Sequence, residues 1–153
     1  FILLLVANGS PVVMSILLSK RWQWPLDGGL RLPDGKRLFG SSKTIPGLVV
    51  AIATTTLTAL LIGPSVWIGL SIGAFAMLGD VLSSFVKRRL GLASGDSAVG
   101  LDQIPESLLP LLVCKPLLGL SWTQVVLLTT AFFFVNLLMS RIMRRSGFVK
   151  QTD

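Results

Sequence analysis

The residues best suited to chemistry in this sequence begin with a carboxylate inside an apolar segment. Asp80 is followed at four, seven and eight positions by Ser84, Lys87 and Arg88. In a helix, Asp80, Ser84 and Lys87 then share one face with Arg88 beside it, and Asp80 lies about 10 Å deeper than Lys87. A carboxylate inside a membrane helix costs roughly 2.5–3.5 kcal/mol on insertion scales, so Asp80 needs a cation, a metal ion or a water-filled cavity. Cations above a carboxylate suit a phosphate ligand that carries a divalent ion, although an Asp80–Lys87 pair that only joins helices fits the same spacing.

A second carboxylate follows after a short loop. Asp102 and Gln103 come just before Pro105, which is a suitable first-turn residue for the next helix. Asp102 then has two interpretations of similar weight. It is either an ordinary helix N-cap or a second metal ligand that faces Asp80.

Residues 39–44 form a third polar group, Phe-Gly-Ser-Ser-Lys-Thr, with Gly47 shortly after it. Glycine lets the backbone approach a phosphate, and hydroxyl and ammonium groups donate to its oxygens near a helix start. Ser42, Lys43 and Thr44 are therefore candidate phosphate ligands. The spacing is not that of a P-loop, and Lys43 fits equally well as an interfacial anchor of the following helix.

Asn8 is a polar residue within the first apolar stretch, close to Pro11. An amide in this place is typical of an interhelical hydrogen bond near a proline kink. Contact with a polar ligand is the alternative interpretation.

Composition excludes several kinds of site. The chain of 153 residues has no His, no Tyr and a single Cys, so His-based triads, imidazole zinc sites and disulfide frameworks are excluded. The net charge of +7 does not predict a nucleic-acid partner, because the basic residues lie in gaps between apolar runs rather than along a soluble face. Chemistry must then rest on Asp, Lys, Arg, Ser, Thr and Asn.

Long apolar stretches must position these residues. Hydrophobic residues make up 52% of the chain and the mean hydropathy is +0.76, which is typical of a membrane protein. The lengths of the runs favour helices over barrel strands. We expect one all-α domain over 1–153, a bundle of five transmembrane helices at about 1–19, 45–62, 66–90, 103–120 and 122–145.

Charge alternates between the connections. The loops over 20–44 and 91–102 and the C-terminal tail are basic, whereas the connections at 63–65 and 119–121 carry no charge. The positive-inside rule then predicts an outside N-terminus, an inside C-terminus and two polar cytoplasmic loops. The chain is expected to be a multi-pass protein of the cell membrane.

The order of these motifs resembles a known family. Gly79-Asp80, Ser84, Lys87-Arg88 and Leu101-Asp102-Gln103 resemble the signature region of the CTP:phosphatidate cytidylyltransferases, and Lys43-Thr44 with Gly47 resembles their Lys-Thr-x-x-Gly stretch. The whole chain is more similar to the archaeal branch, the CDP-archaeol synthases. The segments that carry this resemblance are Asn8, 26–29, 32–35, 39–44, 79–80 and 85–92. The bacterial Gly-His-Gly-Gly stretch is missing, and Gln103 stands where the bacterial family has Arg.

The resemblance implies transfer of the cytidylyl group of CTP to an ether-lipid phosphate, 2,3-bis-O-geranylgeranylglycerol 1-phosphate, with release of pyrophosphate. It implies Mg²⁺ as cofactor, and CTP, the isoprenoid lipid phosphate and membrane lipids as partners. Site roles are then expected as follows: Asp80 and Asp102 for the metal; Lys87 and Arg88 as catalytic cations; Ser42, Lys43, Thr44, Ser84, Arg89, Asn8 and Gln103 for CTP or its phosphates. The alternative is a small transporter or channel subunit with Asp80 in an ion path.

Overall fold

The computed structural model describes residues 1–18 and 24–145 of the chain. This described part contains five helices: α1 (Ile2–Leu18), α2 (Ile45–Ile62), α3 (Val66–Arg89), α4 (Gln103–Leu118) and α5 (Trp122–Arg145). Each bound lies within two residues of its sequence prediction. We call residues 24–44 loop one and residues 90–102 loop two. Loop one has isolated β-bridges, Pro25 with Thr44 and Arg31 with Arg37, and the described residues form no longer strand, so the fold is all-α as expected. The predicted basic residues Lys20, Arg21 and Lys150 lie outside the described residues.

Local signals explain where the helices begin and end. The Thr44 side chain accepts a hydrogen bond from the Gly47 amide at the start of α2, and the Ser65 side chain caps α3 in the same way. Gly63 ends α2 and Gly119 ends α4, each in the left-handed conformation that favours glycine. The sharp connections therefore follow directly from the sequence.

Three of the helices, α2, α3 and α5, are long and apolar enough to cross a membrane, whereas Ile2–Leu17 is shorter. α4 spans 16 residues and contains Glu106 and Lys115. All five helices contribute to one buried apolar cluster, which includes Leu4, Ile72 and Phe132. This cluster holds the bundle together below the polar site.

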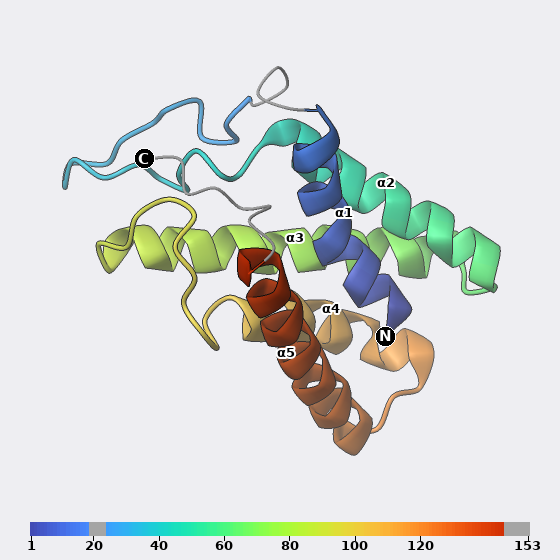
Figure 1. Ribbon diagram of the computed structural model, residues 1–153. Coiled ribbons are helices and arrows are strands. Elements are labelled where there is room, and N and C mark those ends of the chain that lie inside the picture. The colour runs from blue at the N-terminus through green and yellow to red at the C-terminus, as the bar shows by residue number, and fades with distance from the viewer. Residues whose placement is uncertain (19–23, 146–153) are drawn as a thin grey trace.

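The two long loops, 24–44 and 90–102, gather at one end of the bundle, and the N-terminus and both short turns lie toward the other end (Figure 1). We call the end that holds the two long loops the loop end. α3 lies between α2 and α4 and contacts both extensively. Gly69 and Gly73 permit the first contact, because a Cβ on Gly73 would lie 3.0 Å from the Ile52 Cα atom of α2.

Gly79 brings α3 and α4 together at the loop end. A Cβ on Gly79 would overlap the carbonyl oxygen of Pro105 and crowd the Glu106 amide nitrogen. Only glycine allows this approach. Asp80 therefore lies directly beside the first turn of α4, which carries the next set of polar side chains.

Candidate functional site

A cavity of about 610 Å³ opens at the loop end of the bundle. Its walls come from α1, loop one, the first turn of α2, the second half of α3, loop two and the first turn of α4, with α5 on one side. Eight of the sequence-predicted site residues line it: Asn8, Ser42, Lys43, Thr44, Asp80, Lys87, Asp102 and Gln103. Residues from seven parts of the chain therefore converge on one hollow.

Asp80 has a cation as its partner, and the cation comes from loop one. The Lys43 Nζ atom lies 2.5 Å from Asp80 Oδ1, and both side chains keep about a fifth of their surface exposed. The Asp80–Lys87 pair considered from spacing does not form. Asp80 thus satisfies its charge through Lys43 and also faces the cavity.

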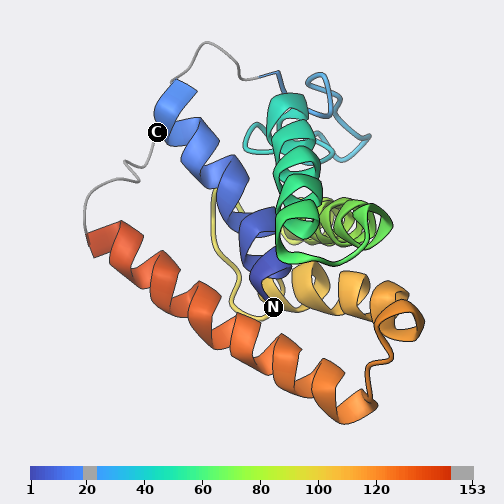
Figure 2. The ribbon, with the colours of Figure 1, turned by 90° about the vertical axis from the view of Figure 1, so that its right-hand side faces the viewer.

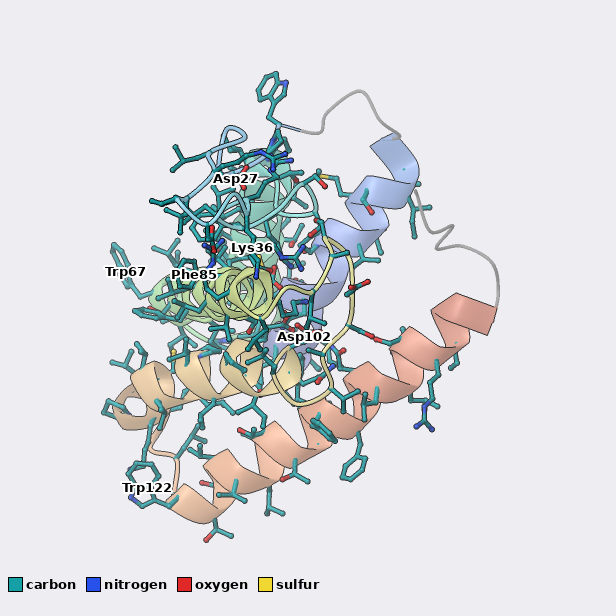
Figure 3. The ribbon with its side chains drawn as sticks, turned by 90° about the vertical axis from the view of Figure 1, so that its left-hand side faces the viewer. Asp27, Lys36, Trp67, Phe85, Asp102 and Trp122 are labelled. Atoms are coloured by element: carbon teal, nitrogen blue, oxygen red, sulfur yellow. The ribbon has the colours of Figure 1, made fainter. Side chains whose placement is uncertain are left out.

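Lys87 pairs instead with the second carboxylate. Its Nζ atom lies 2.7 Å from Asp102 Oδ1 and donates a hydrogen bond to the Asp96 carbonyl oxygen at 2.9 Å. The other Asp102 oxygen accepts from the Ala98 amide at 2.9 Å. Asp102 occupies the N-cap position of α4, but its side chain makes no capping bond to that helix. In Figure 3, Asp102 lies beside the end of α3, on the side of that helix away from Asp27.

Glu106 is a third carboxylate that the sequence analysis did not select. It is 8% exposed, lines the cavity, and lies within hydrogen-bonding reach of the Asp80 carboxyl. It follows Asp102 by four positions, about one helical turn, so the two lie on the same side of the chain at the start of α4. That spacing is the signal that could have identified it.

Loop one takes its shape from Asp27, whose side chain is fully buried. One Asp27 oxygen accepts from Arg37 at 2.7 Å and from the Gly29 amide, and the other accepts from the Phe39 and Gly40 amides. Burial alone would raise the pKa of this carboxyl, but these four donors outweigh it and lower that pKa to about 2. The Asp27 carboxylate therefore fixes the segment that leads into Lys43.

Loop two closes against loop one through small residues. The Ser94 hydroxyl accepts from the Ser42 amide at 3.1 Å and lies 3.3 Å from the hydroxyls of Ser41 and Ser42. Gly40 has a φ of +95°, and a Cβ there would meet the Ser94 Oγ atom at 2.8 Å. Glycine is thus required for the two loops to meet beside the cavity.

Three of the predicted site residues lie outside the cavity wall. Ser84 is buried within α3. Arg88 donates to the Ala93 carbonyl at 2.7 Å, and Arg89 pairs with Asp34 at 2.6 Å. The two arginines, at the C-terminal end of α3, thus hold the loops in place in this structure.

The remaining predicted residues have local partners as well as a place in the cavity wall. The Asn8 amide donates to the Leu4 carbonyl within α1, and the Gln103 side chain accepts from the Gly100 amide. The hydrogen bond expected from Asn8 to another helix is therefore absent among the described residues. Each side chain leaves part of its hydrogen-bonding capacity for a ligand.

The donor set suits Mg²⁺ better than a metal held by protein alone. Among the described residues, no group of three or more His, Cys, Asp or Glu side chains has the geometry of a metal site. Mg²⁺ commonly takes one or two carboxylates and completes its shell with water and substrate phosphates. Asp80 and Asp102 line the cavity and are of the type that could serve as such ligands, and Lys43 and Lys87 beside them could contact phosphate oxygens.

Several known proteins are similar to this chain in sequence. The chain matches the family model described as CarS-like, CDP-archaeol synthase, over residues 3–150. The CDP-archaeol synthase of Thermofilum pendens is 41% identical over 105 residues, which are 65% of this chain and 51% of that protein. That of Pyrobaculum arsenaticum is 39% identical over 71% of this chain and 67% of its own length, and that of Saccharolobus islandicus is 35% identical over 73% and 71%.

A solved structure has the same fold. It is an intramembrane enzyme for archaeal membrane lipids biosynthesis, with 31% sequence identity, a TM-score of 0.70 and 91% of each chain covered. Together with the three long apolar helices, this neighbour identifies a membrane protein. The aligned segment spans about half the length of the Thermofilum pendens relative and at least two thirds of the other two. The relatives do not favour the transporter or channel alternative.

Proposed function

The chain belongs to the CDP-archaeol synthase family, and on that premise we propose that it transfers the cytidylyl group of CTP to an ether-lipid phosphate. The products are a CDP-activated lipid, CDP-archaeol, and pyrophosphate. The proposed lipid substrate is 2,3-bis-O-geranylgeranylglycerol 1-phosphate. One observation carries the proposal: two carboxylate–lysine pairs, Asp80 with Lys43 and Asp102 with Lys87, face one cavity at the end of an apolar bundle.

The attacking group needs no general base from the protein. A phosphate monoester has a second pKa of about 6, so most of it is dianionic at neutral pH. An oxygen of this group attacks the α-phosphorus of CTP, the bond to the bridging oxygen breaks, and pyrophosphate leaves. The absence of His from the sequence is compatible with this reaction, since catalysis then rests on positioning and charge neutralisation.

The lysines have the task of neutralising charge on the phosphates. Lys43 and Lys87 are each held by a carboxylate at 2.5 and 2.7 Å, so their ammonium groups are in place before the nucleotide arrives. Ser42 and Thr44 add hydroxyls to the same wall. Preorganised donors of this kind stabilise developing negative charge without further rearrangement.

Asp80 and Asp102 are the residues we assign to Mg²⁺, with Glu106 beside Asp80 as a positioning group. When bound, the ion would neutralise phosphate oxygens and orient them for displacement. The carboxylates come from α3 and from the last residue before α4, and α3 and α4 meet at Gly79. A rigid contact between helices thus sets their separation.

We further propose five membrane crossings, with the N-terminus outside and the loops and C-terminus in the cytoplasm. Basic residues at the loop end, Lys36, Arg37 and Arg89 among them, support this orientation. The site then opens toward cytoplasmic CTP while remaining within reach of lipid in the cell membrane.

The test is a product assay with purified protein, CTP, Mg²⁺ and a panel of lipid phosphates with ether or ester chains. We expect a CDP-lipid and one equivalent of pyrophosphate. Failure to form a CDP-lipid from every lipid phosphate, with folded protein, would overturn the proposal.

A further inference from the structure

The cavity reaches one side of the bundle, between α1 and α5. Val12 and Ser15 of α1 and Asn136 and Ser140 of α5 line it, together with the residues of the candidate site. In Figure 2, the C-terminal half of α5 runs away from α1. We call the part of the cavity lined by these four residues the α1–α5 opening.

The opening begins one helical turn beyond the buried apolar cluster. Leu4 of α1 and Phe132 of α5 belong to the same apolar cluster and are almost fully buried. Asn8 and Asn136 each lie four residues further toward the loop end, and both line the cavity. Both helices thus contribute to the buried cluster at one level and to the cavity wall at the next, where each carries an asparagine.

Asn136 and Ser140 are otherwise out of place on α5. Their four-residue spacing puts them on one face of a helix that is otherwise long and apolar enough to cross a membrane. Within the described part of the chain, neither side chain has a hydrogen-bond partner. Polar groups inside a membrane bundle are expensive without a partner, so a ligand that accepts hydrogen bonds would stabilise them.

The environment of the opening selects the kind of ligand. Exposed apolar residues flank it on both helices: Val13 and Ile16 on α1, Leu138 and Met139 on α5. These face the region that lipid chains occupy, whereas the inner wall leads to Asp80 and Lys87. A molecule with an apolar tail, an uncharged stretch rich in acceptor oxygens and a terminal phosphate matches this order.

We propose that the lipid phosphate enters sideways through the α1–α5 opening, and that Asn136 and Ser140 donate hydrogen bonds to its glycerol ether oxygens. The proposal rests on the proposed cytidylyl transfer and adds the route of the lipid and two residues that recognise it. Ether oxygens only accept hydrogen bonds, so the amide and hydroxyl donors are complementary to them. The hydrocarbon chains stay in the bilayer while the phosphate reaches the carboxylate–lysine pairs.

The experiment compares purified wild-type protein with Asn136→Leu and Ser140→Ala, and with Thr130→Val as a matched control. Thr130 is an exposed residue of α5 outside the cavity wall. Initial rates are measured with lipid phosphate varied at saturating CTP, and with CTP varied at saturating lipid phosphate. For Asn136→Leu we expect the KM for lipid phosphate to rise about tenfold, as loss of one to two hydrogen bonds implies, and the KM for CTP to stay within about twofold.

Ser140→Ala removes only a hydroxyl, so its lipid KM should rise by about threefold even if Asn136→Leu fails to fold. Thr130→Val should match the wild type. An unchanged lipid KM in both cavity variants, or an equal rise in both KM values, would overturn the lipid route. Wild-type protein that forms no CDP-lipid would instead overturn the proposed function, so the two failures are distinguishable.

Discussion

Lys43 and Asp80 lie 37 positions apart in the chain, and their Nζ and Oδ1 atoms are 2.5 Å apart. This pair connects loop one to the C-terminal half of α3. It gives the carboxylate inside an apolar helix a partner, and it places a cation on the cavity wall. A side chain that neutralises the site in the free protein can thus contact phosphates once a nucleotide is bound.

The first prediction concerns Lys43. Replacing it with Met removes the cation but retains most of the side-chain length. We expect the KM for CTP to rise by about tenfold or more, because a charge-assisted contact to phosphate contributes about 1.5–3 kcal/mol. The measurement is the rate of pyrophosphate release as a function of CTP. Lys36→Met is the control, since Lys36 is exposed and lies outside the cavity wall, and a similar change in both variants would contradict the assignment.

Glu106 provides the second prediction, as a positioning residue for Asp80. Glu106→Gln keeps the size of the side chain and its ability to form hydrogen bonds. Glu106→Leu removes the ability to form hydrogen bonds. We expect the Gln variant to retain kcat within about tenfold and the Leu variant to lose about 100-fold or more. Rates at saturating CTP and Mg²⁺ give the comparison. Equal losses in the two variants would show that Glu106 acts as a carboxylate rather than by orienting Asp80.

The third prediction tests the contact that sets the carboxylate separation. Gly79→Ala would force a Cβ against the backbone of Pro105, which cannot move without shifting α4. We expect a loss of about 2–3 kcal/mol in the free energy of unfolding. Gly9→Ala is the control, because a Cβ there meets nothing within 4 Å, and Ala favours the helix. Thermal unfolding in detergent measures both variants, and equal melting temperatures for Gly79→Ala and wild type would disprove the close contact.

The fourth prediction is that the Asp27 carboxylate makes the free energy of unfolding depend on pH. Its folded pKa of about 2 lies below the ordinary value of 3.8, so its stabilising effect is complete above pH 4 and is lost as the pH falls through 2. The difference between these values corresponds to about 2 kcal/mol. We expect Asp27→Asn to be less stable than wild type at pH 7 and the gap to shrink by this amount toward pH 2. The free energies of unfolding of the wild type and of Asp27→Asn, measured from pH 7 to pH 2, check this expectation. A difference between the two proteins that does not change with pH would rule out the Asp27 carboxylate as the cause.

The helices could be predicted closely because their ends carry local signals. Thr44 and Ser65 cap helix starts, Gly63 and Gly119 end helices, and apolar runs fill the space between. The family was also recognisable from short motifs, since these bring together residues with a definite chemistry. In both cases the informative residues lie within a few positions of one another in the chain.

The partners of the charged residues could not be predicted in the same way. Spacing permitted a pair between Asp80 and Lys87, because both lie on one face of α3. The real partner depends on how loop one folds around Asp27 and returns to α3, which is a tertiary event. Glu106 was not selected from the sequence, although it follows Asp102 by four positions and lines the same cavity.

Arg88 and Arg89 illustrate the same limit. A basic run at a helix end is compatible both with phosphate binding and with bonds to nearby carbonyl oxygens. The structure directs Arg88 to the Ala93 carbonyl and Arg89 to Arg37 and Asp34. Their proposed contact with phosphates stays a prediction, and in this structure they fix the loops that carry Lys43 and Asp102.

The most direct measurement follows the phosphorus atoms of CTP in wild-type protein and in Asp80→Asn. With Mg²⁺ and an ether-lipid phosphate, label at the α-phosphorus should appear in the lipid and label at the γ-phosphorus in pyrophosphate. Asp80→Asn should lower both by about 100-fold or more, whereas Asp34→Asn, which alters an exposed loop carboxylate outside the cavity, should not. Transfer of the γ-label to lipid, release of label only as nucleotide hydrolysis products, or normal transfer by Asp80→Asn would contradict the account.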